Sequence, residues 1–279
     1  MSAPATPRVG FIGLGSQGGP MARRIAAAGF PTTLWARRPE TLAAFADTGA
    51  AVAGSAAELA AASDIACVCV VDDAGVEEVV SGPDGLLAGI EPGGLIAVHS
   101  TVHPDTCRRL ADLAAARDVA FVDAPVSGGG HSAEQGKLLV MAAGDAGAVE
   151  RARPVFESYG DPVLHLGEVG AGQSAKLINN LMMAANLGVA ESGFALAARL
   201  GVDRAQLSQV LAHGSGGSFS ASVLGPPDFT LTPLAEYAGP LLRKDVRLVV
   251  ALADGGGDAK AGTVLAAADA ALESLGHPR

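Results

Sequence analysis

The feature that most constrains this chain is a glycine-rich turn between an apolar strand and a helix. The stretch VGFIGLGSQGGPMARRIAAAGF covers residues 9–30, and within it Gly13-Leu14-Gly15-Ser16-Gln17-Gly18 matches G-x-G-x-x-G. In such a turn the first glycine permits a tight bend, the second lets a pyrophosphate approach the backbone, and the third lets helix and strand pack closely. The pattern predicts a dinucleotide site with the phosphates at the helix N-terminus. The alternative is a glycine turn with a structural role alone.

The following chain alternates short apolar runs with helical segments. Strands are expected within residues 8–13, 32–36, 64–71, 94–100, 120–126, 138–144 and 162–167. Several intervening helices open on a capping residue or a proline, as at Ser55, Pro39 and Asp145. Apolar strands that alternate with helices predict a parallel sheet covered on both faces. Residues 1–168 are therefore expected to form a Rossmann-type, doubly wound α/β domain.

From residue 169 onward the sequence is typical of helices alone. Residues 174–200 are expected to form one helix, roughly 40 Å long at about 1.5 Å per residue, and Gly201 is placed to end it. Helical segments continue afterwards, so residues 169–279 predict an all-helical domain that the long helix joins to the first. This helix carries more apolar surface than one small domain covers. A homodimer or homotetramer that buries it is predicted.

Composition and charge narrow the class of protein. The formal net charge of −10 disfavours a nucleic-acid surface, which needs a basic stripe. The three cysteines form no C-x-x-C pair, which favours reduced thiols, and neither they nor the histidines have metal-ligand spacing. No metal is predicted.

The sequence also bears on localisation. The first eight residues, MSAPATPR, lack the basic start and apolar stretch of a secretory signal. The longest apolar region, residues 175–200, carries a set of polar side chains that a membrane span rarely tolerates, namely Lys176, Asn179, Asn180 and Glu191. A cytoplasmic protein without a membrane partner is expected.

The end of the second predicted strand bears on the choice of cofactor. An NAD site usually has an acidic residue there that accepts hydrogen bonds from the ribose 2′-hydroxyl. Here the strand ends TTLWARRPE, with Arg37 and Arg38 and no acid before Glu40. A guanidinium binds a 2′-phosphate, whereas a carboxylate repels it. NADP is therefore predicted over NAD through Arg37, while Arg38 has the alternative of a solvated charge at a helix start.

Four motifs in order resemble the β-hydroxyacid dehydrogenases. They are GFIGLGSQGGPMARRIAAAGF, DAPVSGGGHSAEQGKLLVMAAGD, GAGQSAKLINNLMMAANLGVAESGFALAARLG and LLRKDV, and together they cover nearly the whole chain. The family includes 3-hydroxyisobutyrate dehydrogenase and tartronate semialdehyde reductase, and it is related to 6-phosphogluconate dehydrogenase and the imine reductases. The resemblance implies a Rossmann-type domain followed by a helical domain built around a long helix, with a cleft between them.

The resemblance also implies roles for individual residues. Lys176 matches the catalytic lysine of the family, and Asn180 matches its substrate-orienting asparagine. The substrate carboxylate is expected at the loop formed by Ser127, Gly128 and Gly129. The implied cofactor contacts outside the glycine turn and the arginines are Val71, Asp72, Ser100, Thr101 and Lys244.

The chemistry of the residues themselves agrees with these roles. Lys176 and Asn180 are spaced i and i+4, so they lie on one helix face. The pKa of a lysine falls readily when it is desolvated, which suits proton transfer near neutral pH. The alternative is a lysine that lies along the surface. Two positions depart from the family: Gln17 replaces a usual methionine, and His131 follows the substrate loop, where it either contacts substrate or is only exposed.

The predicted function is an NADP(H)-dependent oxidoreductase that moves a hydride between nicotinamide and a small 3-hydroxy acid or its semialdehyde. Lys176 is expected to act as general acid and base, without a covalent intermediate. An imine reductase is the first alternative, although such enzymes generally lack this lysine. A non-catalytic NADP-binding protein is the second, for which the pair Lys176 and Asn180 is unnecessary.

Overall fold

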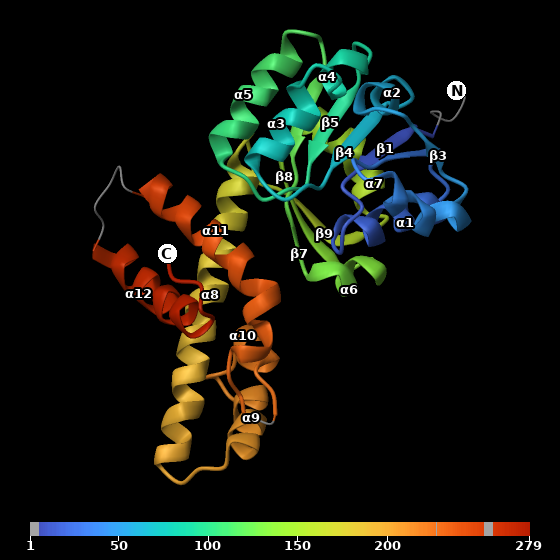
Figure 1. Ribbon diagram of the computed structural model, residues 1–279. Coiled ribbons are helices and arrows are strands. Elements are labelled where there is room, and N and C mark those ends of the chain that lie inside the picture. The colour runs from blue at the N-terminus through green and yellow to red at the C-terminus, as the bar shows by residue number, and fades with distance from the viewer. Residues whose placement is uncertain (1–5, 227, 254–258) are drawn as a thin grey trace. The chain divides into compact units, whose positions relative to one another are not determined.

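The computed structural model describes residues 6–226, 228–253 and 259–279 (Figure 1). The chain packs as two compact units, Met1–Lys176 and Leu177–Arg279, called here the N-terminal and C-terminal units. The sequence placed a boundary between residues 168 and 169. In the structure, the first residues of the long helix α8 (Ala171–Arg199) still pack within the N-terminal unit.

A nine-stranded sheet forms the centre of the N-terminal unit. Its order is β3-β2-β1-β4-β5-β6-β8-β7, with β9 beside β8. The strands on the parallel side are β1 (Val9–Ile12), β2 (Thr32–Trp35), β3 (Ala51–Val52), β4 (Ile65–Val68), β5 (Leu95–Val98) and β6 (Ala120–Asp123). The remaining strands are β7 (Val126–Ser127), β8 (Leu138–Gly144) and β9 (Gly160–His165). The order 3-2-1-4-5-6 of the first six is that of dinucleotide-binding sheets.

The far side of this sheet departs from the predicted parallel arrangement. Strand β8 runs antiparallel to β6 and β7, and only β9 is parallel to it. Residues 128–137 join β7 to β8 and include the short helix α6 (Gly129–Glu134). Such a connection is shorter than the dozen or more residues that a parallel crossover needs, so the chain returns antiparallel.

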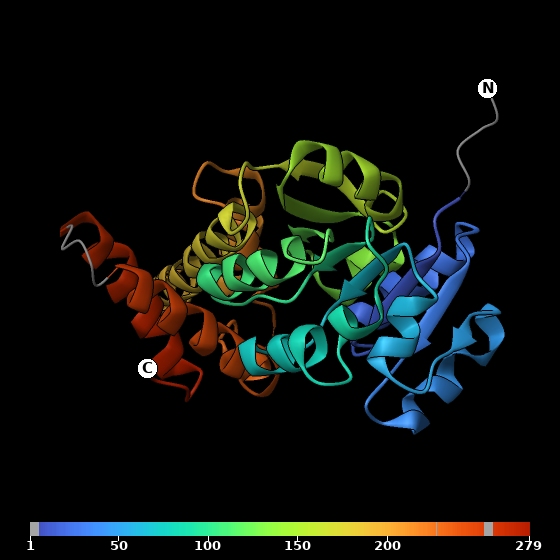
Figure 2. The same cartoon turned by 90° about the horizontal axis from the view of Figure 1, so that it is seen from above.

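Helices cover both faces of the sheet, and each face has its own core (Figures 1 and 2). Helices α1 (Gly18–Ala27), α6 and α7 (Ala146–Phe156) pack on one face. Helices α2 (Ala56–Ala61), α3 (Asp73–Ser81), α4 (Leu86–Gly89) and α5 (Pro104–Ala115) pack on the other. Strand β1 is buried throughout because Phe11 points into the first core and Ile12 into the second.

The local signals of the sequence have the expected effects at the helix starts. Ser55 and Asp145 are N-caps whose side chains accept hydrogen bonds from Glu58 and Ala148 N–H groups. Pro39 opens a 3₁₀ helix, η1 (Pro39–Thr48), where an ordinary helix was expected. The short elements β3, α4 and α6 were not predicted.

The C-terminal unit is all-helical around the long helix α8. The other helices are α9 (Arg204–His213), α10 (Phe219–Val223), η2 (Thr232–Leu234), α11 (Ala235–Ala253) and α12 (Ala259–Ser274). Their shared core contains Leu187, Phe194, Val246 and Leu272. A Cβ on Gly188 would lie 2.5 Å from the Ala267 carbonyl oxygen, so this glycine lets α8 and α12 approach closely. Gly201 has a φ of 74° just past α8, where the sequence predicted the helix to end.

By length and hydropathy, α8 is the single helix in the described part of the chain that meets the criterion for a membrane span. It has 29 residues and a mean hydropathy of 1.4, with 44% of the tested window buried. Core helices of soluble proteins meet the same criterion, so this is weak evidence for a span.

Candidate cofactor and active site

Most of the candidate residues lie where the parallel strands end. The glycine turn follows β1, and the segments that begin at Cys69 and His99 follow β4 and β5. From β1 the chain builds the sheet outward in one direction through β2 and β3, and then returns to the other side of β1 to form β4. Ligands of open α/β sheets bind at such a switch point. The fold therefore brings these segments to one edge of the N-terminal unit.

The glycine turn has the shape of a backbone cradle. Gly13 has a φ of 98°, and a Cβ there would lie 2.0 Å from the Cys69 carbonyl oxygen. A Cβ on Gly18 would lie 2.0 Å from the Gly13 carbonyl oxygen, whereas one on Gly15 would meet no atom within 4 Å. Two of the glycines thus fit the backbone together, and the third leaves open space beside the start of α1. This arrangement fits a dinucleotide pyrophosphate.

The two arginines after β2 are exposed. Within the described residues, the side chains of Arg37 and Arg38 make no hydrogen bond or ion pair, and Arg38 is the backbone N-cap of η1. Strand β2 lies parallel to β1, with Trp35 beside Ile12, so Arg37 follows β2 at the same edge as the glycine turn. An exposed guanidinium there is available to an anion.

The loop after β4 is tied to the loop after β5. The Val70 N–H group donates to Ser100 Oγ at 2.8 Å. Val71 is 71% exposed, and the Asp72 carboxylate caps α3 by accepting from Gly75 N–H. Ser100 is buried and Thr101 half-buried. The Ser100 hydroxyl therefore acts at least as a structural link between the two loops.

His99 lies beneath this loop in the core. Its ring contacts Phe11, Phe156 and Tyr159. Nδ1 lies 2.7 Å from the Ala124 carbonyl oxygen, which requires a donating N–H, and Nε2 then accepts from the Tyr159 hydroxyl at 3.1 Å. Burial lowers the pKa of His99 to about 4, so the ring is neutral and structural.

The predicted substrate loop lies close to the glycine turn. Ser127 ends β7, and Gly128 and Gly129 have φ values of 132° and 75°. A Cβ on Gly130 would lie 2.4 Å from the Ser16 carbonyl oxygen, so the start of α6 packs on the turn itself. His131 is exposed and lies near Gln135 and Glu134 on the same short helix.

Lys176 is buried near the start of α8, with 9% of its surface exposed. Two residues that sequence reasoning missed hold this end of the helix. Asp123 accepts from the Gly170 and Gln173 N–H groups, and the Gln173 side chain bonds to the backbone of Ser100 and Val102. The available signals were an acid at the end of a strand and a glutamine three residues before the lysine.

The remaining candidates belong to the C-terminal unit. Asn180, four residues after Lys176 on α8, donates to Asp245 Oδ2 at 2.6 Å. Lys244 Nζ lies 3.0 Å from Asp245 Oδ1, although this oxygen accepts no hydrogen bond within the described residues. The buried Asp245 thus orients Asn180, a role that the KD motif alone did not indicate.

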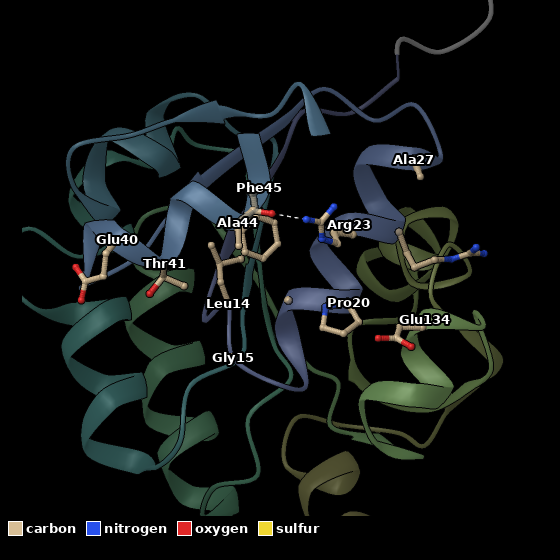
Figure 3. Close-up of a pocket in the computed structure, with 12 residues that line it drawn as sticks. Leu14, Gly15, Pro20, Arg23, Ala27, Glu40, Thr41, Ala44, Phe45 and Glu134 are labelled. Atoms are coloured by element: carbon tan, nitrogen blue, oxygen red, sulfur yellow. Dashed lines mark hydrogen bonds between the residues drawn. The ribbon is translucent and has the colours of Figure 1, made fainter. Parts of the chain in front are cut away.

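A cavity of about 590 Å³ opens beside the glycine turn (Figure 3). Leu14, Pro20 and Phe45 line it, and Arg23 crosses it to donate to the Ala44 carbonyl. It shares Leu14 and Gly15 with the turn but includes neither arginine after β2 and no residue of the loops after β4 and β5. Of the predicted cofactor contacts it therefore reaches only Leu14 and Gly15 of the turn. Among the described residues, no group of three or more His, Cys, Asp or Glu side chains is placed to hold a metal.

Two family profiles match consecutive parts of the chain. The profile of the NAD binding domain of 6-phosphogluconate dehydrogenase matches residues 8–167. The profile described as NAD-binding of NADP-dependent 3-hydroxyisobutyrate dehydrogenase matches residues 170–275. Together they cover both units.

Individual relatives agree with the profiles. The chain is 34% identical over 250 residues to 3-hydroxyisobutyrate dehydrogenase of Pseudomonas aeruginosa, covering 87% of this chain and 84% of the relative. It is 36% identical over 220 residues to NAD-dependent L-serine dehydrogenase of the same organism, covering 78% and 74%. A solved structure of Mycobacterium tuberculosis 3-hydroxyisobutyrate dehydrogenase with L-serine superposes with a TM-score of 0.83 at 27% identity, covering 98% and 99%.

These matches confirm the predicted resemblance and the Rossmann-type fold with a helical C-terminal part. They support a nicotinamide cofactor and leave the preference between NAD and NADP open. The chain belongs to the β-hydroxyacid dehydrogenase family of nicotinamide-dependent oxidoreductases, which includes 3-hydroxyisobutyrate dehydrogenase.

Proposed function

We propose that the protein is an NADP(H)-dependent dehydrogenase or reductase of a small 3-hydroxy acid or its semialdehyde. The observation that carries this proposal is the buried Lys176, held through Gln173 to the segment that follows β5. That segment begins at the same sheet edge as the glycine turn. A lysine in this setting suits proton transfer beside a bound dinucleotide.

Each candidate residue has a defined task in this proposal. When bound, the nicotinamide supplies or accepts the hydride. Lys176 Nζ takes the proton of the substrate hydroxyl during oxidation and returns it during reduction. Ser127 and the backbone of Gly128 and Gly129 hold the carboxylate, and Asn180 orients the substrate.

NADP is the proposed cofactor because of the charge after β2. Arg37 and Arg38 are exposed there, and the sequence has no acid before Glu40. A guanidinium is suited to a 2′-phosphate by charge and by its paired donors. The other proposed contacts are the glycine turn, Val71, Asp72, Ser100, Thr101 and Lys244. One relative is named as NAD-dependent, and the test below therefore compares both cofactors.

The names of the relatives support the substrate class. One is a 3-hydroxyisobutyrate dehydrogenase and another an L-serine dehydrogenase. Both named compounds carry a hydroxyl on the third carbon of a carboxylic acid and differ in the group on the second carbon. A short 3-hydroxy acid with a variable second carbon is thus the proposed substrate. An imine reductase stays the alternative, and Lys176 argues against it.

A spectrophotometric panel tests the proposal. Short 3-hydroxy acids with NADP⁺ or NAD⁺, and the matching semialdehydes with NADPH or NADH, are followed at the nicotinamide absorbance. Turnover of at least one 3-hydroxy acid, higher with NADP⁺ than with NAD⁺, is expected. Cyclic imines are included, and reduction of imines without oxidation of any hydroxy acid would show the alternative to be correct. Binding of NADPH without turnover of any compound would instead favour the non-catalytic protein.

A further inference from the structure

We propose that Asp123 and Gln173 are the positioning residues of the proton-transfer lysine. Together they fasten the first turn of α8 to the ends of β5 and β6, and thereby set the place of Lys176 relative to Ser100 and Thr101. This inference rests on the proposed function for the role of Lys176, and all of its contacts lie within the N-terminal unit.

Asp123 holds the backbone at the start of the helix. It is the last residue of β6, and its surface is fully buried. Oδ1 accepts from Gly170 N–H at 2.7 Å, and Oδ2 accepts from Gln173 N–H at 2.8 Å. The first N–H groups of a helix have no partner within the helix, and a carboxylate satisfies them most strongly. Because the two donors bracket the turn, one side chain fixes both its position and its direction.

Gln173 holds the same turn to the loop after β5. Its side chain is fully buried; Nε2 donates to the Ser100 carbonyl at 2.8 Å, and Oε1 accepts from Val102 N–H at 3.0 Å. A flipped amide would place donor against donor, so the orientation follows from the partners. Thr101 lies between the two bonded residues. One amide therefore fixes the segment that contains the predicted cofactor contacts Ser100 and Thr101.

These bonds form a continuous chain. Val70 N–H donates to Ser100 Oγ, the Ser100 carbonyl accepts from Gln173 Nε2, and Gln173 N–H donates to the Asp123 carboxylate. The chain thus links the ends of β4, β5 and β6 to α8. A Cβ on Gly172 would lie 2.3 Å from the Met141 carbonyl oxygen and 2.8 Å from Asp123 Oδ2. The turn therefore packs against the sheet without room for a side chain.

The position of Lys176 follows from this turn. It comes three residues after Gln173, about 4.5 Å further along the axis at about 1.5 Å per residue. Its side chain is buried, so a displaced helix start also displaces the ammonium group within a packed environment. A misplacement of about 1 Å can lower turnover by roughly 10²-fold.

Protonation of Asp123 provides an internal test. Burial raises the pKa of this carboxyl to about 6, opposed by the Gly170 and Gln173 N–H groups and by Arg108 of α5. Cys107, also on α5, is a further titratable group that interacts with it. A protonated carboxyl has one oxygen that carries hydrogen and accepts poorly, so acid weakens the hold on α8. Turnover is expected to fall below about pH 6 for this reason.

The experiment compares Gln173→Met and Asp123→Asn with the wild type, and uses Gln206→Met on an exposed position of α9 as the matched control. The measurements are kcat and KM of semialdehyde reduction across pH 5–9, the NADPH dissociation constant, and amide hydrogen exchange of residues 98–104 and 168–178. Reduction is used because Lys176 acts in it as an acid, so protonation of the lysine at low pH does not itself lower kcat. Gln173→Met is expected to lower kcat by roughly 10–100-fold. Exchange should accelerate in both segments, and the NADPH dissociation constant should rise by a smaller factor than kcat falls, because the glycine turn and Arg37 lie outside them. Asp123→Asn should also lose the decline of kcat below pH 6.

Three results would overturn the inference: unchanged kcat in both variants, unchanged exchange at residues 98–104 in Gln173→Met, or a decline below pH 6 that persists in Asp123→Asn. If Gln173→Met does not fold, Gln173→Glu replaces it, because it keeps the acceptor for Val102 N–H and loses the donor to Ser100. Hydrogen exchange needs no substrate. A wild type that oxidises no hydroxy acid would therefore contradict the proposed function, while the coupling of the two segments would still be measured.

Discussion

The two units differ in how completely each covers its own apolar side chains. Of the seventeen exposed large apolar residues in the described parts of the chain, five lie in the N-terminal unit and twelve in the smaller C-terminal unit. Two cores on either side of a sheet satisfy the first unit, whereas a single helical core serves the second. The N-terminal unit buries most of its large apolar side chains. The C-terminal unit exposes many of them, which is typical of a surface that a partner covers.

Much of this surplus lies on one face of α8. Ile178, Met182, Val189 and Leu196 are spaced by four, seven and seven residues, and each is between 48% and 61% exposed. At about 100° per residue, these four side chains fall within about 40° of one another around the helix. An exposed apolar stripe of this kind is typical of a subunit interface.

The variant with the largest expected effect tests whether Lys176, the last residue of the N-terminal unit, transfers the proton. Lys176→Ala should lower turnover by about 10²–10⁴-fold, because a positioned acid or base contributes about that much. NADPH binding should barely change, since the proposed phosphate contacts are elsewhere. Steady-state kinetics and fluorescence titration measure the two quantities.

Two further variants sharpen this test. Lys176→Arg should not restore activity, because a guanidinium keeps its proton near neutral pH. Lys137→Ala alters an exposed lysine of the same unit and should leave turnover unchanged. Near-full activity of Lys176→Ala on the best hydroxy acid would disprove the proposed mechanism.

The next prediction tests the surplus apolar surface of the C-terminal unit. We propose that the stripe on α8 forms a homodimer or homotetramer interface. Val189→Glu combined with Leu196→Glu should weaken assembly by at least roughly 100-fold, because like charges brought together in an interface cost several kcal/mol. Sedimentation velocity across micromolar concentrations measures the change. The matched control is Val52→Glu, which alters a 62% exposed valine of the N-terminal unit. A fully active wild-type monomer would contradict the interface.

A third prediction concerns the core of the N-terminal unit. Burial lowers the pKa of His99 from 6.5 to about 4, so its contribution to stability is complete above pH 6.5 and is lost as pH falls toward 4. A shift of this size corresponds to roughly 3 kcal/mol. His99→Phe should be less stable at pH 7 but should lose less stability between pH 6.5 and 4. Denaturant titrations at several pH values measure the free energy of unfolding.

The control for this experiment comes from the other unit. His213→Gln removes an exposed histidine of α9 and serves as the matched substitution. Burial raises the pKa of Asp123 to about 6, so its ionisation lowers stability as pH rises from about 4 to 6, opposite in sign to the effect of His99. Both proteins retain Asp123, and their difference isolates His99. Parallel curves for wild type and His99→Phe would disprove the assignment.

The smallest expected effect concerns the cofactor preference. Arg37→Asp should weaken NADPH binding by about 1.5–3 kcal/mol by removing a charge-assisted pair, and should affect NADH less. Arg38→Asp, one position further on, serves as the control and should have the smaller effect. Fluorescence titration with both cofactors measures the difference. Equal losses for NADPH and NADH would show that Arg37 does not read the 2′-phosphate.

The sequence predicted those parts of the molecule that local patterns determine. The glycine turn, the strands on the parallel side other than β3, and the long helix each carry their signal within a short window. The antiparallel return of β8 was missed because it depends on the length of a connection, and the short elements β3, α4 and α6 carry little periodicity. Asp123 and Gln173 escaped notice for a different reason: their partners are 47 to 73 residues away in the chain, and no local pattern reveals such pairs.

Gly15 differs from the other two glycines of the turn, because the fold itself does not require a glycine at this position. Gly13 and Gly18 have backbone atoms where a side chain would be, but a methyl group at Gly15 would meet nothing, and its φ is not positive. Alanine at such a position stabilises a protein by about 0.4–1 kcal/mol, because it restricts the unfolded chain. In the absence of a bound dinucleotide, an alanine at position 15 would therefore be compatible with the fold and more stable. In the proposed cofactor site, the missing carbon atom leaves room for the pyrophosphate, at the cost of that stability.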